Sequence, residues 1–307
     1  MPVAGSHPPT WAALLASLMR RVPRGRYRYL SHLPAAPPFR ARFPPAPQLR
    51  FTCDLHDAIS REVYFTGQYE PQLTRLLQAV TVPGGVALDL GANWGYFSLL
   101  LAALVGEQGR VVSLEPEPRL FRRLQADIMN NRLSWVEGLQ AAATDVDGDL
   151  WLEPYASARG NWGISRVGLV GQGVRVHGRC VDGLLDERGL ERVDITKMDI
   201  EGAEGDALRG MTAGLHRQRY RHLLIEWHPV RLGQDRLAGA RRLLSEAGYR
   251  GWAIDHSRRA TQQAAYRSRI ELSSALDTAD DWPHALFVCP DDAAVAEQRL
   301  SAVAAFR

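Results

Sequence analysis

The sequence predicts an α/β fold built around an open, mostly parallel sheet. Two observations point to it: short apolar runs that suit strands buried on both faces, and helix-length segments between them. The clearest example is residues 86–115, VALDLGANWGYFSLLLAALVGEQGRVVSLE, where strand, glycine turn, helix and strand follow one another. With 307 residues and 46% hydrophobic content, the chain can bury one sizeable core. We expect seven strands, with helices on both faces of the sheet.

The first unit of this sheet predicts a nucleotide pocket. Residues 86–90 form a buried strand, residues 91–95 turn, and residues 96–105 are long enough for about three helical turns. Glu115 then stands at the carboxyl end of the second strand, residues 111–114. In an open α/β sheet, an acid at that position can accept hydrogen bonds from both hydroxyls of a ribose.

The glycine turn distinguishes between nucleotides. A dinucleotide fold requires GxGxxG, whereas this turn is DxGxNxG, with Asp89 two residues before Gly91 and Asn93 after it. An acid and an asparagine repel a diphosphate, but they suit a ligand that carries an ammonium and a sulfonium group. S-adenosylmethionine is such a ligand, and Gly95 completes the turn that would hold it. An ordinary βα turn, with Asp89 as a helix-capping acid, is the alternative.

The first 50 residues differ in composition from the rest of the chain. They hold eight arginines, no aspartate or glutamate, and ten of the 18 prolines. Such a segment is typical of an arm that wraps a core or stays loose, rather than of a domain. Residues 11–19, WAALLASLM, predict a short helix that packs on the core. We divide the chain into this basic arm (1–50), a main domain (51–290) and a helical tail (291–307).

Composition also argues against several classes of protein. Cys53, Cys180 and Cys289 are far apart and show no CxxC spacing, which disfavours a disulfide framework or a zinc site. No apolar stretch reaches membrane-spanning length. The basic arm lacks regularly spaced aromatic residues, so we expect no nucleic-acid partner. These features predict a cytoplasmic protein that acts on a small molecule, with a homo-oligomer as an open option.

Two regions after the first unit are expected to border a ligand. A third strand is predicted over residues 135–142, and its carboxyl end, at Gln140 and Ala141, should lie beside the adenine. Residues 155–173 are rich in Gly, Ser and Asn, a composition typical of loops that contact substrate, although a plain hairpin tip is an equal alternative. The polar candidates in this loop are Asn161 and Ser165.

A second chemical stretch, VDITKMDIEGAE, covers residues 193–204. Alternation places Lys197, the single lysine of the chain, on the same face of the fourth strand as Asp199, which ends the strand. Glu204 enters the following helix near its N-terminus, and helix capping is enough to explain it. Asp199 has no such explanation, and we expect it where a transferred methyl group arrives.

The fifth strand, residues 223–227, is followed by a histidine and a proline. Glu226 and His228 share a face by the same alternation. Two further strands are expected at residues 251–254 and 285–288, as an antiparallel pair.

Glu70 stands immediately before a predicted helix, residues 71–77, whose first residue is a proline. Two roles are open for it. Its side chain caps this helix, or it faces the ammonium group of the ligand.

Six motifs in order give the chain a family resemblance. They are GQYEP, LDLGANWGYFSLL, SLEPEP, NWGIS, KMDIEGAEGDALRG and LIEWHP, and with the later strands they cover residues 67–288. The chain resembles the FkbM-type S-adenosylmethionine-dependent methyltransferases, with Cys180 standing where the family often has leucine. The resemblance implies a Rossmann-like class I methyltransferase fold. It places Asp89, Gly91, Asn93 and Gly95 on the methionine and ribose side of the cofactor, and Glu115 on the ribose. The predicted cofactor set is completed by Glu70, Tyr96, Pro116, Gln140, Ala141 and Asp199.

The family methylates varied hydroxyl groups on small natural products and sugars, so the resemblance implies O-methylation of a small molecule. In-line methyl transfer depends chiefly on holding the acceptor oxygen close to the methyl group. An alcohol is a weak acid and needs a base, for which His228 is the candidate, with Asp199 orienting it or the acceptor. Lys197 and Glu226 complete the predicted catalytic set. Because the sulfonium loses its charge during transfer, an aromatic lining from Trp94, Tyr96 and Trp227 is also expected.

Four alternatives to this prediction stay open. Asp199, Glu226 and His228 could bind a divalent cation that acidifies the hydroxyl, which we rank below a metal-free route. The acceptor could be a nitrogen of a small molecule or peptide. The chain could keep the pocket without catalysis, or act as an NAD-dependent oxidoreductase, for which the glycine pattern is missing.

Overall fold

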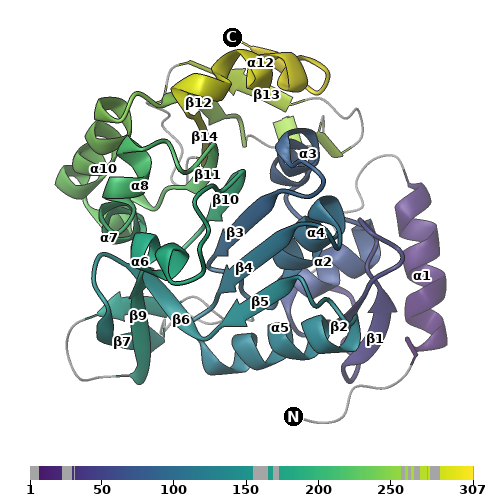
Figure 1. Ribbon diagram of the computed structural model, residues 1–307. Coiled ribbons are helices and arrows are strands. Elements are labelled where there is room, and N and C mark those ends of the chain that lie inside the picture. Colours follow the sequence, from purple (N-terminus) through teal and green to yellow (C-terminus); the bar gives the residue numbers. More distant parts are fainter. Residues whose placement is uncertain are drawn as a thin grey trace.

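The computed structural model has a large twisted sheet at its centre (Figure 1). The structure describes residues 7–22, 30, 32–154, 165–168, 173–256, 260–261, 264–265, 270–274, 276 and 284–306. Within these ranges the central sheet has nine strands. They are β3 (Val86–Leu90), β4 (Arg110–Leu114), β5 (Val136–Leu139), β10 (Ile195–Met198), β11 (His222–Glu226), β12 (Arg250–Ile254), β13 (Ile270–Ser273), β14 (His284–Val288) and β15 (Ala304–Phe306). Their spatial order is β15-β13-β12-β14-β11-β10-β3-β4-β5.

This sheet confirms the predicted fold class and is wider than predicted by two strands. β14 runs antiparallel to both β11 and β12, as expected for the last predicted pair. The additional strands, β13 and β15, extend the sheet beyond β12. β15 follows the helix of the predicted tail and pairs with β13, so the tail is helical only in part.

The third predicted strand, residues 135–142, is wrong as a single element. β5 ends at Leu139, and β6 (Ala141–Thr144) belongs to a different sheet. The break falls at Gln140, which is exposed between the partly buried end of β5 and the buried strand β6. An apolar run therefore predicts extended backbone here, but it does not tell one straight strand from two strands that meet at a bend.

The chain order of the sheet reverses at β3, which lies between β10 and β4. Asp89 of β3 is in register with Lys197 of β10 and with Ser113 of β4, so the three strands end at the same level. In open α/β sheets, ligands bind in the crevice outside the strand ends at such a reversal. The topology thus marks one place for a pocket.

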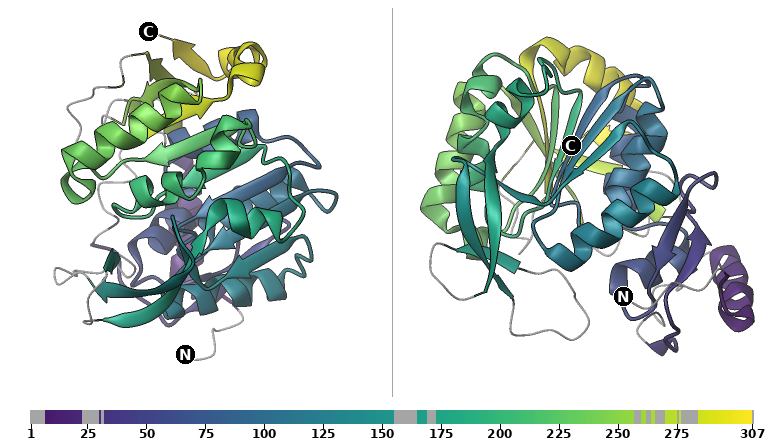
Figure 2. Two further views of the ribbon diagram at one scale, coloured as in Figure 1. Left: turned by 60° about the vertical axis from the view of Figure 1, so that its left-hand side comes forward. Right: turned by 60° about the horizontal axis from the view of Figure 1, so that its bottom comes forward.

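Helices cover both faces of the sheet (Figure 2). One face packs against α3 (Pro71–Val80), α4 (Tyr96–Val105), α5 (Pro118–Asn130) and α12 (Ala293–Ser301). The other packs against α6 (Val181–Asp186), α7 (Glu204–Arg209), α8 (Thr212–His216) and α10 (Gln234–Glu246). The period of two along β3 explains the division, because Ala87 lies in the first core while Leu88 and Leu90 lie in the second. Two short helices, α9 (Pro229–Leu232) and η2 (Pro290–Asp292), follow β11 and β14.

A second, four-stranded sheet lies beside the carboxyl ends of the central strands (Figure 2). It consists of β6, β7 (Gly148–Pro154), β8 (Ser165–Gly168) and β9 (Val174–Cys180), in the order β6-β9-β7-β8. The segment predicted as an irregular insertion therefore contains a strand, which begins at Ser165. The other polar candidate, Asn161, lies outside the described residues.

The N-terminal segment packs against the main domain through a helix and a hairpin. α1 (Thr10–Arg21) lies against α2 (Ala58–Thr66) and buries Ala12, Ala16 and Met19. β1 (Phe39–Arg42) pairs with β2 (Arg50–Cys53). The buried carboxylate of Asp127 in α5 anchors this hairpin, accepting a hydrogen bond of 2.9 Å from the backbone N–H of Thr52 and pairing with Arg40. The division that we draw at residue 50 falls at the first residue of β2.

No helix in the described ranges combines the length and the apolar character needed to cross a bilayer. All three cysteines are free, with Cys53 and Cys289 buried and Cys180 partly buried.

Candidate functional site

A pocket opens where β3, β4 and β10 end, at the reversal of the sheet. Six residues of the predicted cofactor set line it: Gly91, Asn93, Glu115, Pro116, Ala141 and Asp199. The small sheet adds one wall, made by Ala142, Ala143 and Leu152. The chain segments that sequence reasoning treated separately thus meet around one cavity.

Glu115 is the central acid of this pocket. It is 5% exposed, and each of its oxygens accepts a backbone N–H: Oε2 from Asn93 at 2.7 Å and Oε1 from Glu117 at 2.9 Å. Burial raises the pKa of Glu115 to about 7, against the effect of these two hydrogen bonds, which lower it. A carboxylate has about four acceptor positions, so both oxygens keep capacity for hydroxyl groups of a ligand.

The turn after β3 requires glycine at two positions. A Cβ on Gly91, which has a φ of +81°, would lie 1.8 Å from the backbone oxygen of Asp199. A Cβ on Gly95 would lie 2.6 Å from Cδ1 of Leu124 in α5. Asn93 lies between them with a φ of +52° and accepts a hydrogen bond from the N–H of Trp94. This turn brings the backbones of β3 and β10 close enough to form the floor of the pocket.

The charged side chains that line the pocket are all acidic. Glu115, Asp199 and Glu201 face it, and its lining residues include no lysine or arginine. A diphosphate would be repelled by such a lining, whereas a positively charged ligand would be attracted. The observation agrees with the argument from the glycine turn.

Lys197 and Asp89 form a buried group beneath the pocket. Nζ of Lys197 lies 3.8 Å from Oδ1 of Asp89, 3.6 Å from Oδ2 of Asp199, and donates to the backbone oxygen of Gly91 at 3.2 Å. Burial lowers the pKa of Lys197, but the charges of Asp199 and Asp89 outweigh this, so its pKa lies above the ordinary value and it stays an ammonium. Asp89 is fully buried, accepts a hydrogen bond of 2.6 Å from Ser98 and does not line the pocket.

Several other predicted residues lie away from the pocket wall. Tyr96 accepts a hydrogen bond from the N–H of Tyr69 through its hydroxyl and is buried in the core, and Gln140 is exposed. Trp94 and Trp227 are also buried in the core, so the structure does not place the predicted aromatic residues among those that line the pocket. Size explains this, because large apolar side chains next to strand ends gain more by filling the core than by facing solvent.

His228 lies at the centre of an acidic cluster next to Asp199. The residue is 3% exposed, and Nδ1 of its ring lies 2.7 Å from Oε1 of Glu204. Nε2 lies 3.4 Å from Oε2 of Glu201 and 3.8 Å from Oδ1 of Asp199 and Oε1 of Glu226. The predicted catalytic residues Asp199, Glu226 and His228 therefore do come together.

Helix capping does not account for Glu204. Its Oε1 accepts a hydrogen bond of 2.9 Å from Gly202, but its main partner is His228, and α7 has no side-chain cap on its N-cap residue. Glu204 rather than Asp199 is thus the residue that orients the imidazole. Burial lowers the pKa of His228, but Glu204 and then Asp199 and Glu226 outweigh it, so the pKa lies above the ordinary value.

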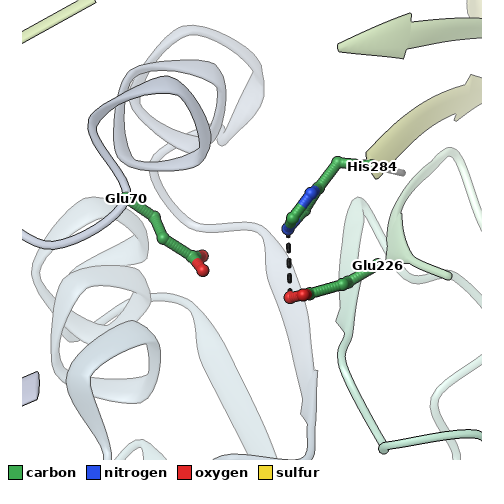
Figure 3. Close-up of side chains that lie close together, drawn as sticks. All are labelled: Glu70, Glu226 and His284. Atoms are coloured by element: carbon green, nitrogen blue, oxygen red, sulfur yellow. Dashed lines mark ion pairs between the residues drawn. The ribbon is translucent and has the colours of Figure 1, made fainter. Parts of the chain in front are cut away.

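Glu70 lies close to Glu226, together with His284, a histidine that the sequence analysis missed (Figure 3). Glu70 is the N-cap residue of α3, yet its side chain makes no capping hydrogen bond. Nε2 of His284 lies 3.0 Å from Oε2 of Glu226, its partner across the β11–β14 pair. Burial, followed by the charge of Glu226, raises the pKa of Glu70 to about 7. A histidine that opens a strand antiparallel to β11 was the available sequence signal.

Comparisons with known proteins agree with this geometry. The family model of the methyltransferase FkbM domain matches residues 89–250. Among curated proteins, methyltransferase sdnD from Sordaria araneosa is 28% identical over 46% of this chain and 66% of its own length. Hexuronic acid methyltransferase AglP from Haloferax volcanii is 27% identical over 52% of this chain and 62% of its own length. The chain spans less than two thirds of the length of the curated relatives that it matches.

Among solved structures, methyltransferase FkbM from Methylobacillus flagellatus KT aligns with a TM-score of 0.42 and 17% identity, over 75% of this chain and 53% of that one. This likeness is too distant to add to the assignment, which depends on the family model alone. That model covers more than half of the 307 residues and includes the glycine turn, Glu115, Lys197, Asp199 and His228. The chain therefore belongs to the FkbM methyltransferase family.

Proposed function

We propose that this protein is an S-adenosylmethionine-dependent O-methyltransferase that modifies a hydroxyl group of a small molecule, such as a natural product or a sugar. The observation that carries the proposal is the acidic pocket at the reversal of the sheet, with Glu115 at the end of β4. In a methyltransferase, such a pocket suits a cationic adenosine ligand and disfavours a phosphorylated one.

The residues present fit this cofactor. We expect Glu115 to accept hydrogen bonds from the two ribose hydroxyls. Gly91 and Asn93 line the same pocket beside it, and Gly91 has no side chain to fill the space. Pro116 and Ala141 offer apolar surface for a planar base. When bound, S-adenosylmethionine would supply an electrophilic methyl group. The chain itself supplies the orientation of the ligand and the acidic lining that attracts its positive charges.

His228 is the proposed general base for the acceptor hydroxyl. Glu204 holds Nδ1, which leaves Nε2 directed toward Asp199, a residue of the pocket wall. The imidazole can then take the hydroxyl proton at Nε2, while Glu204 stabilises the imidazolium that forms. A buried carboxylate in this role orients the ring and favours its charged form.

The acceptor class is supported by the name of one relative, hexuronic acid methyltransferase AglP. The name of methyltransferase sdnD gives no acceptor. Because the chain covers less than two thirds of either, the acceptor is proposed only as a hydroxyl-bearing small molecule. A sugar acid is the first candidate to try.

Calorimetry with S-adenosylhomocysteine and with NAD tests the cofactor. We expect one equivalent of S-adenosylhomocysteine to bind and NAD to give no heat. Transfer of labelled methyl from S-adenosylmethionine to a panel of sugars, sugar acids and hydroxylated natural products then tests the reaction, with mass spectrometry to identify the methylated atom. Folded protein that binds neither S-adenosylmethionine nor its product would overturn the proposal, and methylation of nitrogen would overturn the acceptor assignment.

A further inference from the structure

Three side chains from separate elements converge beside His228, where Oε1 of Glu226 lies near His228 and Oε2 lies near His284. Glu70 comes from the residue before α3, Glu226 from the end of β11 and His284 from the start of β14 (Figure 3). Each offers one ligand atom, and these atoms all lie within 4.8 Å of one another. We propose that Glu70, Glu226 and His284 bind one divalent transition-metal ion beside the methyl-transfer site.

The two strands fix two of the proposed ligands. Glu226 and His284 are directly paired across the antiparallel β11–β14 ladder, so the same backbone hydrogen bonds that hold the sheet also place their side chains on one face. The imidazole is held further by His256, whose ring stacks on it with centroids 3.8 Å apart and planes at 24°. Both ligands are more than nine-tenths buried. Rigid ligands of this kind favour a bound ion because little entropy is lost when it binds.

Glu70 provides the observation that a simple ion pair does not explain. Its Oε2 is buried and has no hydrogen-bond partner among the described residues. Lys197, whose charge also acts on Glu70, lies within 4 Å of Asp89 and Asp199. Two carboxylates that approach within 4.8 Å of each other in a buried setting, with one of them unsatisfied, repel each other unless a cation lies between them.

The donor set indicates the kind of ion. One imidazole nitrogen and two carboxylate oxygens suit Zn²⁺, Mn²⁺ or Fe²⁺, whereas Mg²⁺ and Ca²⁺ prefer oxygen ligands alone. Metal–ligand bonds of about 2.1 Å place neighbouring donors roughly 3.0–3.5 Å apart, so the side chains would need to close by little more than about 1 Å. Three protein ligands leave positions open for other oxygen atoms.

The neighbouring set Asp199, Glu226 and His228 also has ligand atoms within 4.8 Å. Its members have other partners, however. Asp199 is paired with Lys197, and His228 is hydrogen-bonded to Glu204. We favour the set with Glu70 because Oε2 of Glu70 has no hydrogen-bond partner among the described residues, and because an ion there leaves His228 available for the acceptor proton.

This position gives the ion a role, which rests on the proposed function. Glu226 lies between the ion and His228, and His228 lies between Glu226 and Asp199 of the pocket wall. An ion bound there would hold an acceptor by an oxygen next to the methylated one. The acceptor class is then a molecule with two neighbouring oxygen donors, a vicinal diol or a hydroxy acid.

Metal titration of the full chain, made metal-free with a chelator, tests the site. We expect one equivalent of Zn²⁺ to bind by calorimetry, and Co²⁺ to give visible absorption bands of a nitrogen- and oxygen-coordinated ion. Glu70→Gln and His284→Gln should each weaken Zn²⁺ binding at least about tenfold. Asp199→Asn and His228→Gln are the matched controls from the neighbouring set and should keep the affinity of the wild type.

The results separate this inference from the proposed function. The metal site would be overturned if the folded wild-type protein bound neither Zn²⁺ nor Co²⁺. It would also be overturned if Asp199→Asn and His228→Gln lost metal binding while Glu70→Gln and His284→Gln kept it. If one of the histidine variants does not fold, the comparison of Glu70→Gln with Asp199→Asn decides. Binding of S-adenosylhomocysteine is measured on the same samples. Retained cofactor binding without metal binding would remove this inference alone. Metal binding without cofactor binding would remove the proposed function and the role of the ion in it, and would leave the metal site.

Discussion

His228 and Glu204 form a buried pair in which Nδ1 of the imidazole lies 2.7 Å from Oε1 of the carboxylate. The pair joins the second residue after β11 to the first residue of α7, the helix that follows the neighbouring strand β10. It fixes the plane of the ring and directs Nε2 toward Asp199, Glu201 and Glu226. Orientation of the base is thus built into the fold before any ligand binds.

Loss of His228 should separate catalysis from cofactor binding. We expect His228→Ala to lower kcat by about 10²–10⁴-fold, because general-base catalysis contributes factors of this size, while the affinity for S-adenosylhomocysteine is unchanged. Single-turnover methyl transfer and calorimetry measure the two quantities. His222→Gln is the matched control, since His222 is a buried histidine at the other end of β11. Full turnover in His228→Ala would show that another group accepts the proton.

Replacement of Glu115 should weaken the cofactor complex without unfolding the protein. Glu115→Gln removes a charged acceptor, a change that costs about 1.5–3 kcal/mol, or roughly 10–100-fold in the dissociation constant for S-adenosylhomocysteine. Glu117→Gln is the control. Glu117 accepts hydrogen bonds from Arg119 and Leu120 at the start of α5, so its loss should cost about 1 kcal/mol of stability and no affinity. Equal affinities in both variants would contradict the assignment.

Cofactor affinity should depend on pH through Glu115. Its pKa is raised to about 7, and only the ionised form can accept both ribose hydroxyls. Below this pKa a proton must leave before the ligand binds, so affinity should fall as pH decreases from 8 to 6, approaching a limit of about tenfold per pH unit. Calorimetry in buffers of different ionisation enthalpy should detect the released proton below pH 7. The affinity of the Glu115→Gln variant should no longer depend on pH in this range. An unchanged pH profile in that variant would show that another group titrates.

The glycine turn offers a test of the close approach between strands. Gly91→Ala would place a Cβ 1.8 Å from the oxygen of Asp199, whereas Gly106→Ala, also at positive φ, meets no atom within 4 Å. Gly106 has a φ of +69° and a ψ of −177°, a region that is essentially limited to glycine, so backbone strain alone should cost Gly106→Ala about 1–3 kcal/mol of stability. Gly91→Ala should lose clearly more stability than Gly106→Ala and should also lose affinity for S-adenosylhomocysteine. Denaturant unfolding gives the free energy of unfolding of both variants. Equal losses of stability would mean that a small shift of the backbone removes the clash.

The buried lysine offers a test of charge balance. Lys197→Met leaves Asp89 and Asp199 without their cation, and breaking a buried pair in this way typically costs about 3–5 kcal/mol. Adding Asp89→Asn to Lys197→Met removes one of the uncompensated charges and should recover part of the lost stability. Unfolding free energies of the two single variants and the double variant give the coupling between the two residues. Additive effects would show that Lys197 is not needed to balance Asp89.

The local parts of this structure could be predicted because the sequence around them carries the necessary information. The strand of residues 86–90 and the helix of residues 96–105 have the bounds that were expected, since the glycines end each element. Glu115 follows from the same βαβ pattern. The place where the predicted third strand breaks depends instead on which sheet each half can join, and that is decided by distant segments.

The acidic cluster was only partly predictable for a similar reason. Alternation brought Glu226 and His228 to one face, but the pairing of Glu226 with His284 spans two strands that are 58 residues apart in sequence, 284 − 226. Glu204 looked like a capping acid because its position fits one. Its contact with His228 arises from the turn at Gly202, which returns the chain toward β11, and no local pattern encodes that.

The bend at Gln140 gives the pocket two walls of different origin. The proposed ribose side is formed by strands of the central sheet, whereas Ala141, Ala142, Ala143 and Leu152 come from the small sheet, which the chain enters at this bend and leaves from β9 into α6. Substitutions on β7 and β9 can therefore reshape the entrance while the floor stays rigid. Under the proposed function, changes in this one layer would diversify the choice of acceptor without altering the strand ends that hold the methyl donor.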